Sequence, residues 1–333
     1  MIQPQITKFL QNKKNLLAFS AGGDSTALFF LLLEHNIPFD IAIVDYNLRE
    51  QSKAEVAYAK ELAKKYQKEC YVKNSPKIKN NFEANARKIR YDFFSHLIEQ
   101  NGYETLLTAH HLGDRLEWFL MQFTKGAGSV ELVGMKQIEQ KESYTLVRPL
   151  LDLTKEELLE YLKLHKITFF EDETNQDQNY KRNYFRHNFA KPLLQEYAKG
   201  IAKSFEYLEK DVNLLVEDIE VHTFGDMAFF YTTSNKRAQI VALDRYFKKI
   251  GHLLTKNERT LLETKQEVVI SRRYIVAFFE DFICITPFVQ NITLSKEFKE
   301  ECRVLKINPK QRAFFFLNKK SFEFYKNLNK KKV

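Results

Sequence analysis

The sequence predicts an α/β protein, with a parallel-sheet domain followed by a smaller α+β domain. Short apolar segments alternate with longer helical ones over about the first 150 residues, a spacing typical of a parallel sheet covered on both faces. Seven of the ten Gly residues lie at or before Gly134, so tight loops are concentrated in this half. The later part has few Gly and a different pattern, which indicates a second domain.

Each element follows from local composition. The expected strands are short runs of β-forming residues, at 16–19, 39–44, 70–72, 105–109 and 144–150. The expected helices between them lie at 25–36, 52–67, 83–100 and 114–125. A further helix at 153–165 carries a capping box formed by Thr154 and Glu157.

These patterns divide the chain into three parts. We expect the parallel-sheet domain at 1–195, a charged helical connector at 196–220 and a smaller accessory domain at 221–333. The last part combines a helical stretch at 237–264 with β-like runs at 268–279 and 282–288. The Lys-rich tail from residue 318 is predicted either to contact phosphates or to be a disordered, solubilising end.

Composition narrows the class of protein. Lys and Arg number 52 against 43 Asp and Glu, a net charge of +9 that suits a polyanionic partner. Cys70, Cys284 and Cys302 are widely spaced, so neither a disulfide framework nor a Cys-based zinc site is expected. No signal peptide or membrane span is recognisable, so we expect a cytoplasmic protein without membrane contact.

The segment from Ser20 to Thr26, S-A-G-G-D-S-T, joins the first strand to its helix. Small residues let backbone N–H groups close around phosphate oxygens, and the helix N-terminus adds its dipole. The expected nucleotide-binding residues are Ser20, Ala21, Gly22, Gly23, Asp24 and Ser25. Asp24 cannot attract phosphate, so its predicted role is to bind Mg²⁺. A tight capped turn is the structural alternative.

Two common phosphate loops are absent, because the chain has neither G-x-x-x-x-G-K-[ST] nor G-x-G-x-x-G. The segment instead resembles the S-G-G-x-D-S loop of the N-type ATP pyrophosphatases, with Ala21 in place of Gly. The resemblance implies an adenine nucleotide alpha hydrolase-like (PP-loop) fold. It also implies that ATP is cleaved between its α and β phosphates, giving an adenylated intermediate. By the same resemblance, Asp45 and Tyr46 after the second strand lie near the adenine.

A third group opens the helix at 83–100. Glu83, Arg87 and Arg90 are spaced to share one helix face, either as a surface salt-bridge ladder or as a clamp on phosphates. The run from Asn81 to Tyr91 resembles the N-[LF]-E-A-x-A-R-x-x-R-Y signature of the tRNA(Ile)-lysidine synthetases. The resemblance implies that Arg90 acts in catalysis on the intermediate and that Arg87 contacts RNA or the same phosphates.

A fourth group follows the strand at 105–109. His110 and His111 end the strand, and Asp114 and Glu117 share a face of the next helix. Such acids suit Mg²⁺ or a substrate amine, and the His residues can orient a base or assist proton transfer. A His–His–Asp metal site and a helix end favoured by its dipole are the alternatives.

This run resembles the family's H-H-x-D-D-Q-x-E-T, with Gly113, Arg115 and Trp118 departing from it. The resemblance implies that Asp114 and Glu117 bind the lysine substrate and that His110 contacts the modified base. Lys125 begins a K-G-A-G run similar to the family's R-G-[ST]-G loop, and we expect it to contact tRNA.

Further segments resemble the family's RNA-facing elements. They are the R-P-L-L strand with Arg148, the E-D-x-[ST]-N run at 171–175, and the R-N-x-[IF]-R-H run with Arg182 and Arg186. Cations interleaved with Tyr184 and His187 suit an unstacked RNA base, although a solvated basic helix has the same pattern. We therefore expect tRNA contacts from Arg148, Arg182 and Arg186.

Together the resemblance implies a tRNA(Ile)-lysidine synthetase that uses ATP, Mg²⁺ and free L-lysine on tRNA(Ile). The wobble cytidine of the CAU anticodon would be adenylated and then attacked by lysine, releasing AMP and pyrophosphate. A tRNA thiolase, a small-molecule amidotransferase and a non-catalytic RNA-binding protein remain alternatives. Monomer and homodimer are both open.

Overall fold

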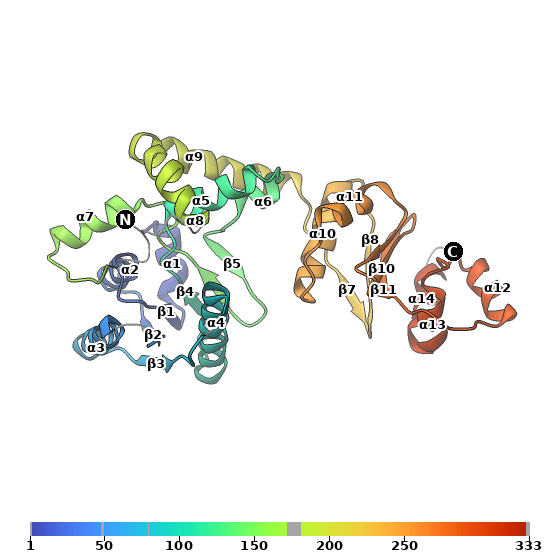
Figure 1. The fold of residues 1–333 in the computed structure, drawn as a ribbon, viewed down its shortest axis with the longest axis horizontal. Helices are drawn as coiled ribbons and strands as arrows, with labels where there is room; N and C mark the ends of the chain where they lie inside the picture. Colours follow the sequence, from blue (N-terminus) through green and yellow to red (C-terminus); the bar gives the residue numbers. More distant parts are fainter. Residues whose placement is uncertain (1, 48–49, 79, 172–180, 331–333) are drawn as a thin grey trace. The chain divides into compact units, whose positions relative to one another are not determined.

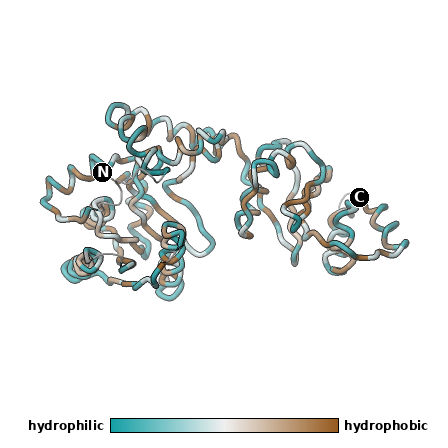
Figure 2. The backbone as a smooth tube through the Cα atoms, viewed as in Figure 1, coloured by the Kyte–Doolittle hydropathy of each residue, from teal (hydrophilic) through white to brown (hydrophobic). Residues whose placement is uncertain are grey.

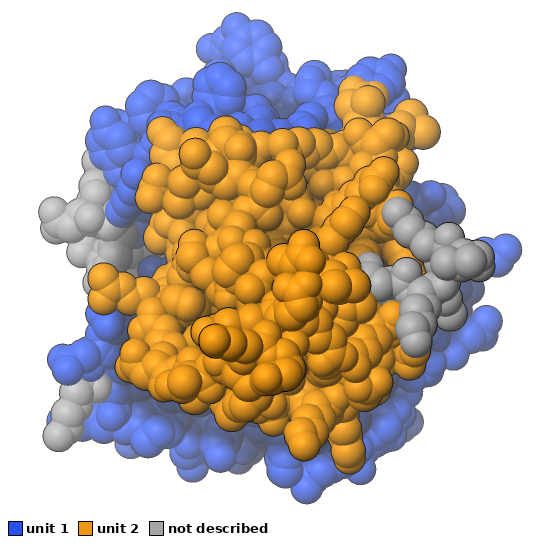
Figure 3. Space-filling view, turned by 90° about the vertical axis from the view of Figure 1, so that its right-hand side faces the viewer, with its two compact units in different colours: residues 1–210 blue, residues 211–333 orange. Residues whose placement is uncertain are grey.

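The computed structural model describes residues 2–47, 50–78, 80–171 and 181–330. The chain divides into two compact units, residues 1–210 and 211–333 (Figure 3). The expected connector at 196–220 lies mostly within helix α9 (Lys191–Leu215), so its first part belongs to the first unit. Each unit is described by itself below.

The first unit is built on a six-stranded sheet in the order β3-β2-β1-β4-β6-β5 (Figure 1). Five strands are parallel, namely β1 (Asn15–Ala18), β2 (Phe39–Asp45), β3 (Cys70–Asn74), β4 (Thr105–Leu107) and β6 (Thr145–Val147). The edge strand β5 (Ile138–Gln140) pairs antiparallel to β6 and was not predicted from the sequence. The parallel α/β architecture is thereby confirmed.

Helices cover both faces of this sheet because its central strands are apolar on both sides. Leu17 of β1 packs in a core with helices α2 (Gly23–Glu34), α3 (Glu50–Lys65) and α7 (Lys155–Leu164). Leu16, its neighbour, points to the opposite face and packs with α4 (Phe82–Asn101). The unit also contains α1 (Pro4–Gln11), which was not predicted, and α6 (Ser129–Val133).

Helix α5 (Leu112–Phe123) lies against α8 (Lys181–Phe185), the π-helix η2 (Arg186–Ala190) and α9. Leu112 and Leu116 of α5 pack with Leu194 and Phe205 of α9. This packing brings the 181–190 segment onto the first turns of α5. The predicted capping box of α7 is present, because Thr154 and Glu157 each bond the other's backbone N–H.

The second unit contains an antiparallel sheet in the order β7-β8-β11-β10-β9. Its strands are β7 (His222–Phe224), β8 (Met227–Tyr231), β9 (Glu267–Ile270), β10 (Tyr274–Phe278) and β11 (Phe282–Pro287). Helices α10 (Lys236–Lys249) and α11 (Lys256–Thr264) share one core with this sheet. A second core includes residues of α12 (Lys296–Val304), α13 (Arg312–Leu317) and α14 (Lys319–Lys330).

Two features of this unit differ from expectation. The run expected at 268–279 is two strands joined by a turn in which Ser271 and Arg272 have φ of 46° and 55°. The tail is not a disordered end up to residue 330, because α14 buries Phe322 and Tyr325.

Hydropathy follows this arrangement. The central strands of each unit are mostly hydrophobic, while the outer helices are largely hydrophilic (Figure 2). Within the described residues, no helix combines the length and the apolar character that crossing a membrane requires.

Candidate active site

The loop after β1 has the geometry of an anion site. Gly22 is the N-cap of α2 and no side chain caps the helix, so its first N–H groups are available to bind an anion. The hydroxyl oxygens of Ser20 and Ser25 are 3.1 Å apart, and the Ser20 N–H donates to Ser25 Oγ at 3.2 Å. The loop is therefore preformed by hydrogen bonds between its two serines, and the buried Ser25 hydroxyl also lies 3.1 Å from the Gly22 carbonyl, to which it donates.

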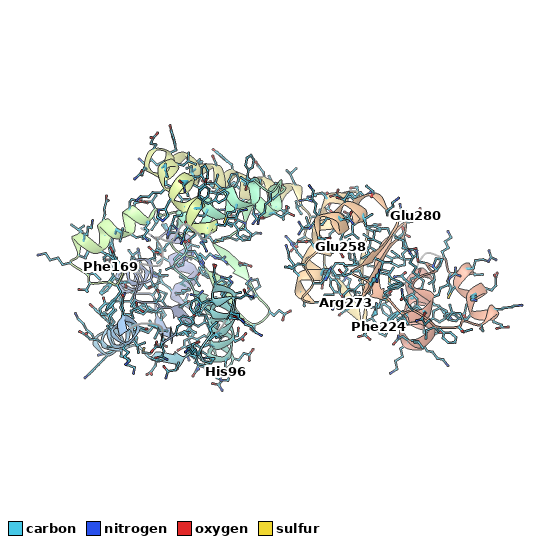
Figure 4. All side chains as sticks on the ribbon, in the orientation of Figure 1. His96, Phe169, Phe224, Glu258, Arg273 and Glu280 are labelled. Carbon is cyan, nitrogen blue, oxygen red and sulfur yellow. The ribbon has the colours of Figure 1, made fainter. Side chains whose placement is uncertain are left out.

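The loop packs against the segment at Phe169 and Phe170. A Cβ on Gly23 would lie 3.4 Å from side-chain atoms of Leu159 and Phe169, of which Phe169 is labelled in Figure 4. Ala21 has a φ of 60°, the left-handed region that favours Gly, and its carbonyl accepts the N–H of Phe170 at 3.0 Å. Ala21, which stands where the S-G-G-x-D-S loop has Gly, therefore carries backbone strain, but the loop still forms.

His111 joins the phosphate loop to the next helix. Its Nδ1 accepts the Gly113 N–H at 3.0 Å, which leaves Nε2 as the ring nitrogen that can donate. Nε2 lies 3.8 Å from Asp24 Oδ2 and 3.6 Å from Asp114 Oδ2. A Cβ at position 113 would lie 2.7 Å from the His111 ring, so Gly113 makes room for it.

The sequence did not reveal this role of His111. The ring belongs to the capping box of α5, in which Asp114 Oδ2 accepts the His111 N–H at 3.0 Å. The signal was available in the sequence, since a polar residue three positions before an acid marks a helix start. Asp24 was predicted to bind Mg²⁺ and Asp114 to bind lysine. The structure places both carboxylates near the same imidazole, that of His111.

The acid pair is held by two arginines. Glu117 is only 1% exposed and accepts Arg182 Nε at 2.8 Å and Arg186 Nε at 2.5 Å. Arg182 Nη2 also donates to Asp114 Oδ1 at 2.5 Å. The two residues predicted to contact tRNA therefore lie on the two residues predicted to bind lysine. Two acids and two guanidinium groups form one mixed-charge cluster.

Charge and burial oppose each other in this cluster. Burial alone would raise the pKa of Asp114, but His111, Arg182 and His110 hold that pKa well below its usual range. For Arg182, burial works to lower the pKa and the charges of Asp114 and Glu117 raise it above its usual value. Both groups are thus charged at neutral pH.

His110 differs from its neighbour. Burial lowers the pKa of His110 to about 4, and the charges of Arg148, Arg182 and Arg87 act in the same direction while Asp114 opposes them. Thr108 Oγ1 lies 2.9 Å from His110 Nδ1 and orients the ring. His110 is therefore neutral at pH 7 and suited to hydrogen bonding, whereas a general base works best with a pKa near the operating pH.

Residues of α4 face the same region. Arg87 is exposed, lies over the Tyr91 ring at 4.7 Å and acts electrostatically on His110. The exposed Arg90 acts on Tyr46, whose pKa is raised by burial and lowered by this charge, with a net rise. The Tyr46 hydroxyl donates to the Ala86 carbonyl at 3.1 Å and so ties the end of β2 to α4.

Three predicted residues have other surroundings. Asp45 is 7% exposed and accepts the Asn47 N–H at 2.8 Å. Arg148 is 6% exposed, and its guanidinium donates to the Lys136 carbonyl at 2.7 Å and to Glu139 at 3.0 Å. Lys125 is exposed at the turn after α5. Arg148 thus braces the β5–β6 edge, and its predicted contact with RNA does not follow from this geometry.

One predicted segment falls outside the described residues, namely the run from Asp172 to Asn175. Within the described parts of the chain, no group of three or more His, Cys, Asp or Glu side chains is placed to hold a metal ion. The His–His–Asp metal centre considered from the sequence therefore gains no support there.

The fold and the loop define a protein with a PP-loop ATP-binding domain, and residues 1–193 match the PP-loop domain family. A solved U34-tRNA thiolase, NcsA from Methanococcus maripaludis, shares this fold with a TM-score of 0.51 and 15% identity. The match covers 62% of this chain and 76% of the thiolase.

Curated relatives define the family more narrowly. The chain is 43% identical to the tRNA(Ile)-lysidine synthase of Wolinella succinogenes over 95% of this chain and 97% of that protein. It is 38% identical to the Campylobacter jejuni enzyme of the same name, covering 96% and 97% of the two chains. The chain belongs to the tRNA(Ile)-lysidine synthase family.

Proposed function

We propose that this protein joins free L-lysine to the wobble cytidine of tRNA(Ile). ATP adenylates the C2 oxygen of the cytidine and pyrophosphate leaves. The side-chain amine of lysine then attacks C2, its proton is lost to solvent and AMP departs with the oxygen. The enzyme is thus an ATP-dependent ligase that forms a carbon–nitrogen bond.

One observation carries this proposal beyond family membership. His111 Nε2 lies within 4 Å of both Asp24, in the phosphate loop, and Asp114, in the cluster with Glu117. These contacts support placing the proposed site for the activated phosphate ester next to the proposed lysine site. Proximity of this kind is what a two-step ligase needs, because the amine must reach the activated carbon before water does.

Mg²⁺ fits the phosphate loop. Asp24 Oδ1 is buried and has no hydrogen-bond partner among the described residues, and such an oxygen suits a hard divalent cation. We assign Mg²⁺ to Asp24, where it would offset charge on the departing pyrophosphate. The N–H groups at the start of α2 and the Ser20 and Ser25 hydroxyls bind the phosphates from the protein side.

The mixed-charge cluster is the proposed lysine site. Asp114 and Glu117 bind the ammonium group of lysine. When lysine enters, Arg182 and Arg186 either leave these carboxylates or share them with that ammonium group. The neutral His110 hydrogen-bonds the cytosine without adding a positive charge beside the adenylated base. Arg87 and Arg90 on α4, with Lys125, are the proposed phosphate contacts.

The cysteines do not fit the thiolase alternative. Cys284 and Cys302 are buried in the second unit, and burial raises the pKa of all three thiols. None is thereby activated as a thiolate, the form that sulfur chemistry requires.

The test is pyrophosphate release with ATP, Mg²⁺ and unmodified tRNA(Ile) transcript, with and without lysine, followed by mass spectrometry of the nucleosides. We expect lysidine only when lysine is present. A transcript with uridine at the wobble position is the control and should give no product. Release of pyrophosphate without any lysidine, or sulfur insertion, would overturn the proposal.

A further inference from the structure

Trp118 is the single Trp of the chain and is 42% exposed. It follows Glu117 directly on α5 and lies one helical turn beyond Asp114, so Asp114 and Trp118 are neighbours on the helix surface. The proposed function uses the two acids and leaves the indole without a role. A large exposed aromatic ring at the rim of an active site can serve as a stacking surface.

The ring is fixed in place along one edge. Its Nε1 donates to the Glu131 carbonyl of α6 at 3.1 Å. At Gly134, with a φ of 61°, a Cβ would lie 2.3 Å from Trp118 Cδ1 and 2.6 Å from Nε1. The backbone after α6 therefore approaches the pyrrole edge closely, and any residue other than Gly would displace the indole. The ring is held rigidly by the protein while part of its surface stays open to solvent.

A rigid, half-exposed indole beside a nucleotide-modifying site has a suitable ligand in an unpaired base. Every base has a π-face, and stacking on an aromatic side chain strengthens binding by about 10- to 100-fold per base. Pre-fixing the ring lowers the entropy lost on binding. The anticodon loop of the proposed substrate presents bases on both sides of the modified cytidine.

We propose that Trp118 is a positioning residue that stacks on an anticodon-loop base next to the modified cytidine. The inference rests on the proposed function, because it takes tRNA as the ligand. The alternative is that Trp118 only joins α5 to α6 through its hydrogen bond. Substitutions can separate the two roles, because stacking requires an aromatic face, whereas the link between α5 and α6 requires the indole N–H as a donor.

The single Trp makes a direct test possible, because intrinsic fluorescence reports on Trp118 alone. Unmodified tRNA(Ile) is added to the full-length protein, and binding is measured independently by anisotropy of labelled tRNA. We expect the Trp emission to be quenched, with a midpoint at the same tRNA concentration as the anisotropy change. Binding without any change in emission would overturn the inference and leave the proposed function standing. Absence of tRNA binding would overturn both.

Substitutions separate stacking from structure. Trp118→Phe keeps an aromatic face and loses the N–H donor, so its Kd for tRNA should stay within about 3-fold of wild type. Trp118→Leu keeps apolar bulk without a π-face and should raise Kd and KM for tRNA by about 10-fold or more, with KM for ATP unchanged. Equal affinity in the Leu variant, or equal losses in Phe and Leu variants, would contradict stacking.

Phe123 provides the matched control. It is a second exposed aromatic on α5, 61% exposed and stacked on Phe119 at 5.8 Å. Phe123→Leu should leave tRNA affinity unchanged, because its ring is already stacked within the helix. An equal loss there would show a general effect of α5 and overturn the assignment to Trp118.

Discussion

Arg186 and Glu117 form a two-point ion pair, with Nε 2.5 Å from Oε1 and Nη2 3.2 Å from Oε2. They are 69 residues apart in the sequence, and each was assigned to a different substrate. Their contact places the proposed lysine site and the basic 181–190 segment in one cluster. We therefore expect lysine binding at the proposed site to be coupled to the position of that segment, because both would use the same carboxylate oxygens.

Glu117→Gln tests the acid pair. We expect KM for lysine to rise by about 10- to 100-fold, because a hydrogen bond to a charged group contributes about 1.5–3 kcal/mol. KM for ATP should not change, since Glu117 does not line the phosphate loop. The measurement is steady-state lysidine formation over a range of lysine concentrations. Glu156→Gln, an exposed acid on α7, is the control, and an unchanged lysine KM in the Glu117 variant would remove the acid from the site.

Asp24→Asn tests the Mg²⁺ assignment. The pyrophosphate-forming step should slow by about 100-fold or more, because the amide binds Mg²⁺ weakly and charge on the leaving group is less well offset. Chelation of divalent cations should abolish the wild-type reaction, and added Mg²⁺ should restore it. Folding should be preserved, as measured by thermal unfolding. Asp92→Asn on the exposed side of α4 serves as the comparison, and wild-type rates in the Asp24 variant would refute the assignment.

His110 predicts a pH dependence of stability. Its pKa is about 4 in the folded protein, against about 6.5 when unfolded. Between these two pH values the unfolded state therefore binds more protons than the folded state. The part of the unfolding free energy that depends on a neutral His110 is fully present above pH 6.5 and is lost as the pH falls toward 4. Between pH 7 and pH 5 the loss is about 2 kcal/mol.

The check is urea unfolding of wild type and His110→Gln at pH 7 and pH 5. Between pH 7 and pH 5, the unfolding free energy of the variant should fall by about 2 kcal/mol less than that of the wild type. His96→Gln, at an exposed position on α4, is the reference for a surface histidine. Identical decreases in wild type and the His110 variant would mean that His110 is not held neutral.

Arg272→Gly is predicted to stabilise the second unit. Ser271 and Arg272 both have positive φ, as in a type I′ turn, and the Arg273 N–H donates to the Ile270 carbonyl at 2.9 Å. Glu258, labelled in Figure 4, holds this turn by accepting the Ser271 N–H and hydroxyl at 3.0 and 2.9 Å.

Glycine at position 272 should relieve about 1 kcal/mol of backbone strain without removing a buried contact. Chemical unfolding measures the change, and Arg273→Gly, outside the positive-φ pair, should not stabilise. A lower unfolding free energy in the Arg272 variant would show that the Arg272 side chain stabilises the protein by more than its backbone strain destabilises it.

Much of the first unit was predictable, because its signals are local. The strands β1 and β2 are apolar runs, α7 carries its capping box in Thr154 and Glu157, and the Ser20–Ser25 loop stands between a strand and a helix. The edge strand β5 was missed because Ile138–Gln140 has an exposed–intermediate–exposed pattern with little apolar content. Helix α14 was missed because its Lys-rich composition is typical of a solvated tail, although Phe322 and Tyr325 within it are buried.

The sequence by itself determined the phosphate loop, the order of the strands and helices that frame it, and the identity of the two acids on α5. These follow from neighbouring residues, whose spacing is fixed by the backbone. Only the tertiary structure decided the partners of these groups: His111 between Asp24 and Asp114, Arg182 and Arg186 on Glu117, and Arg148 braced against Glu139. Side chains far apart in sequence meet only when the packing of α5 against α8 and η2 brings them together, and no local pattern encodes that distance.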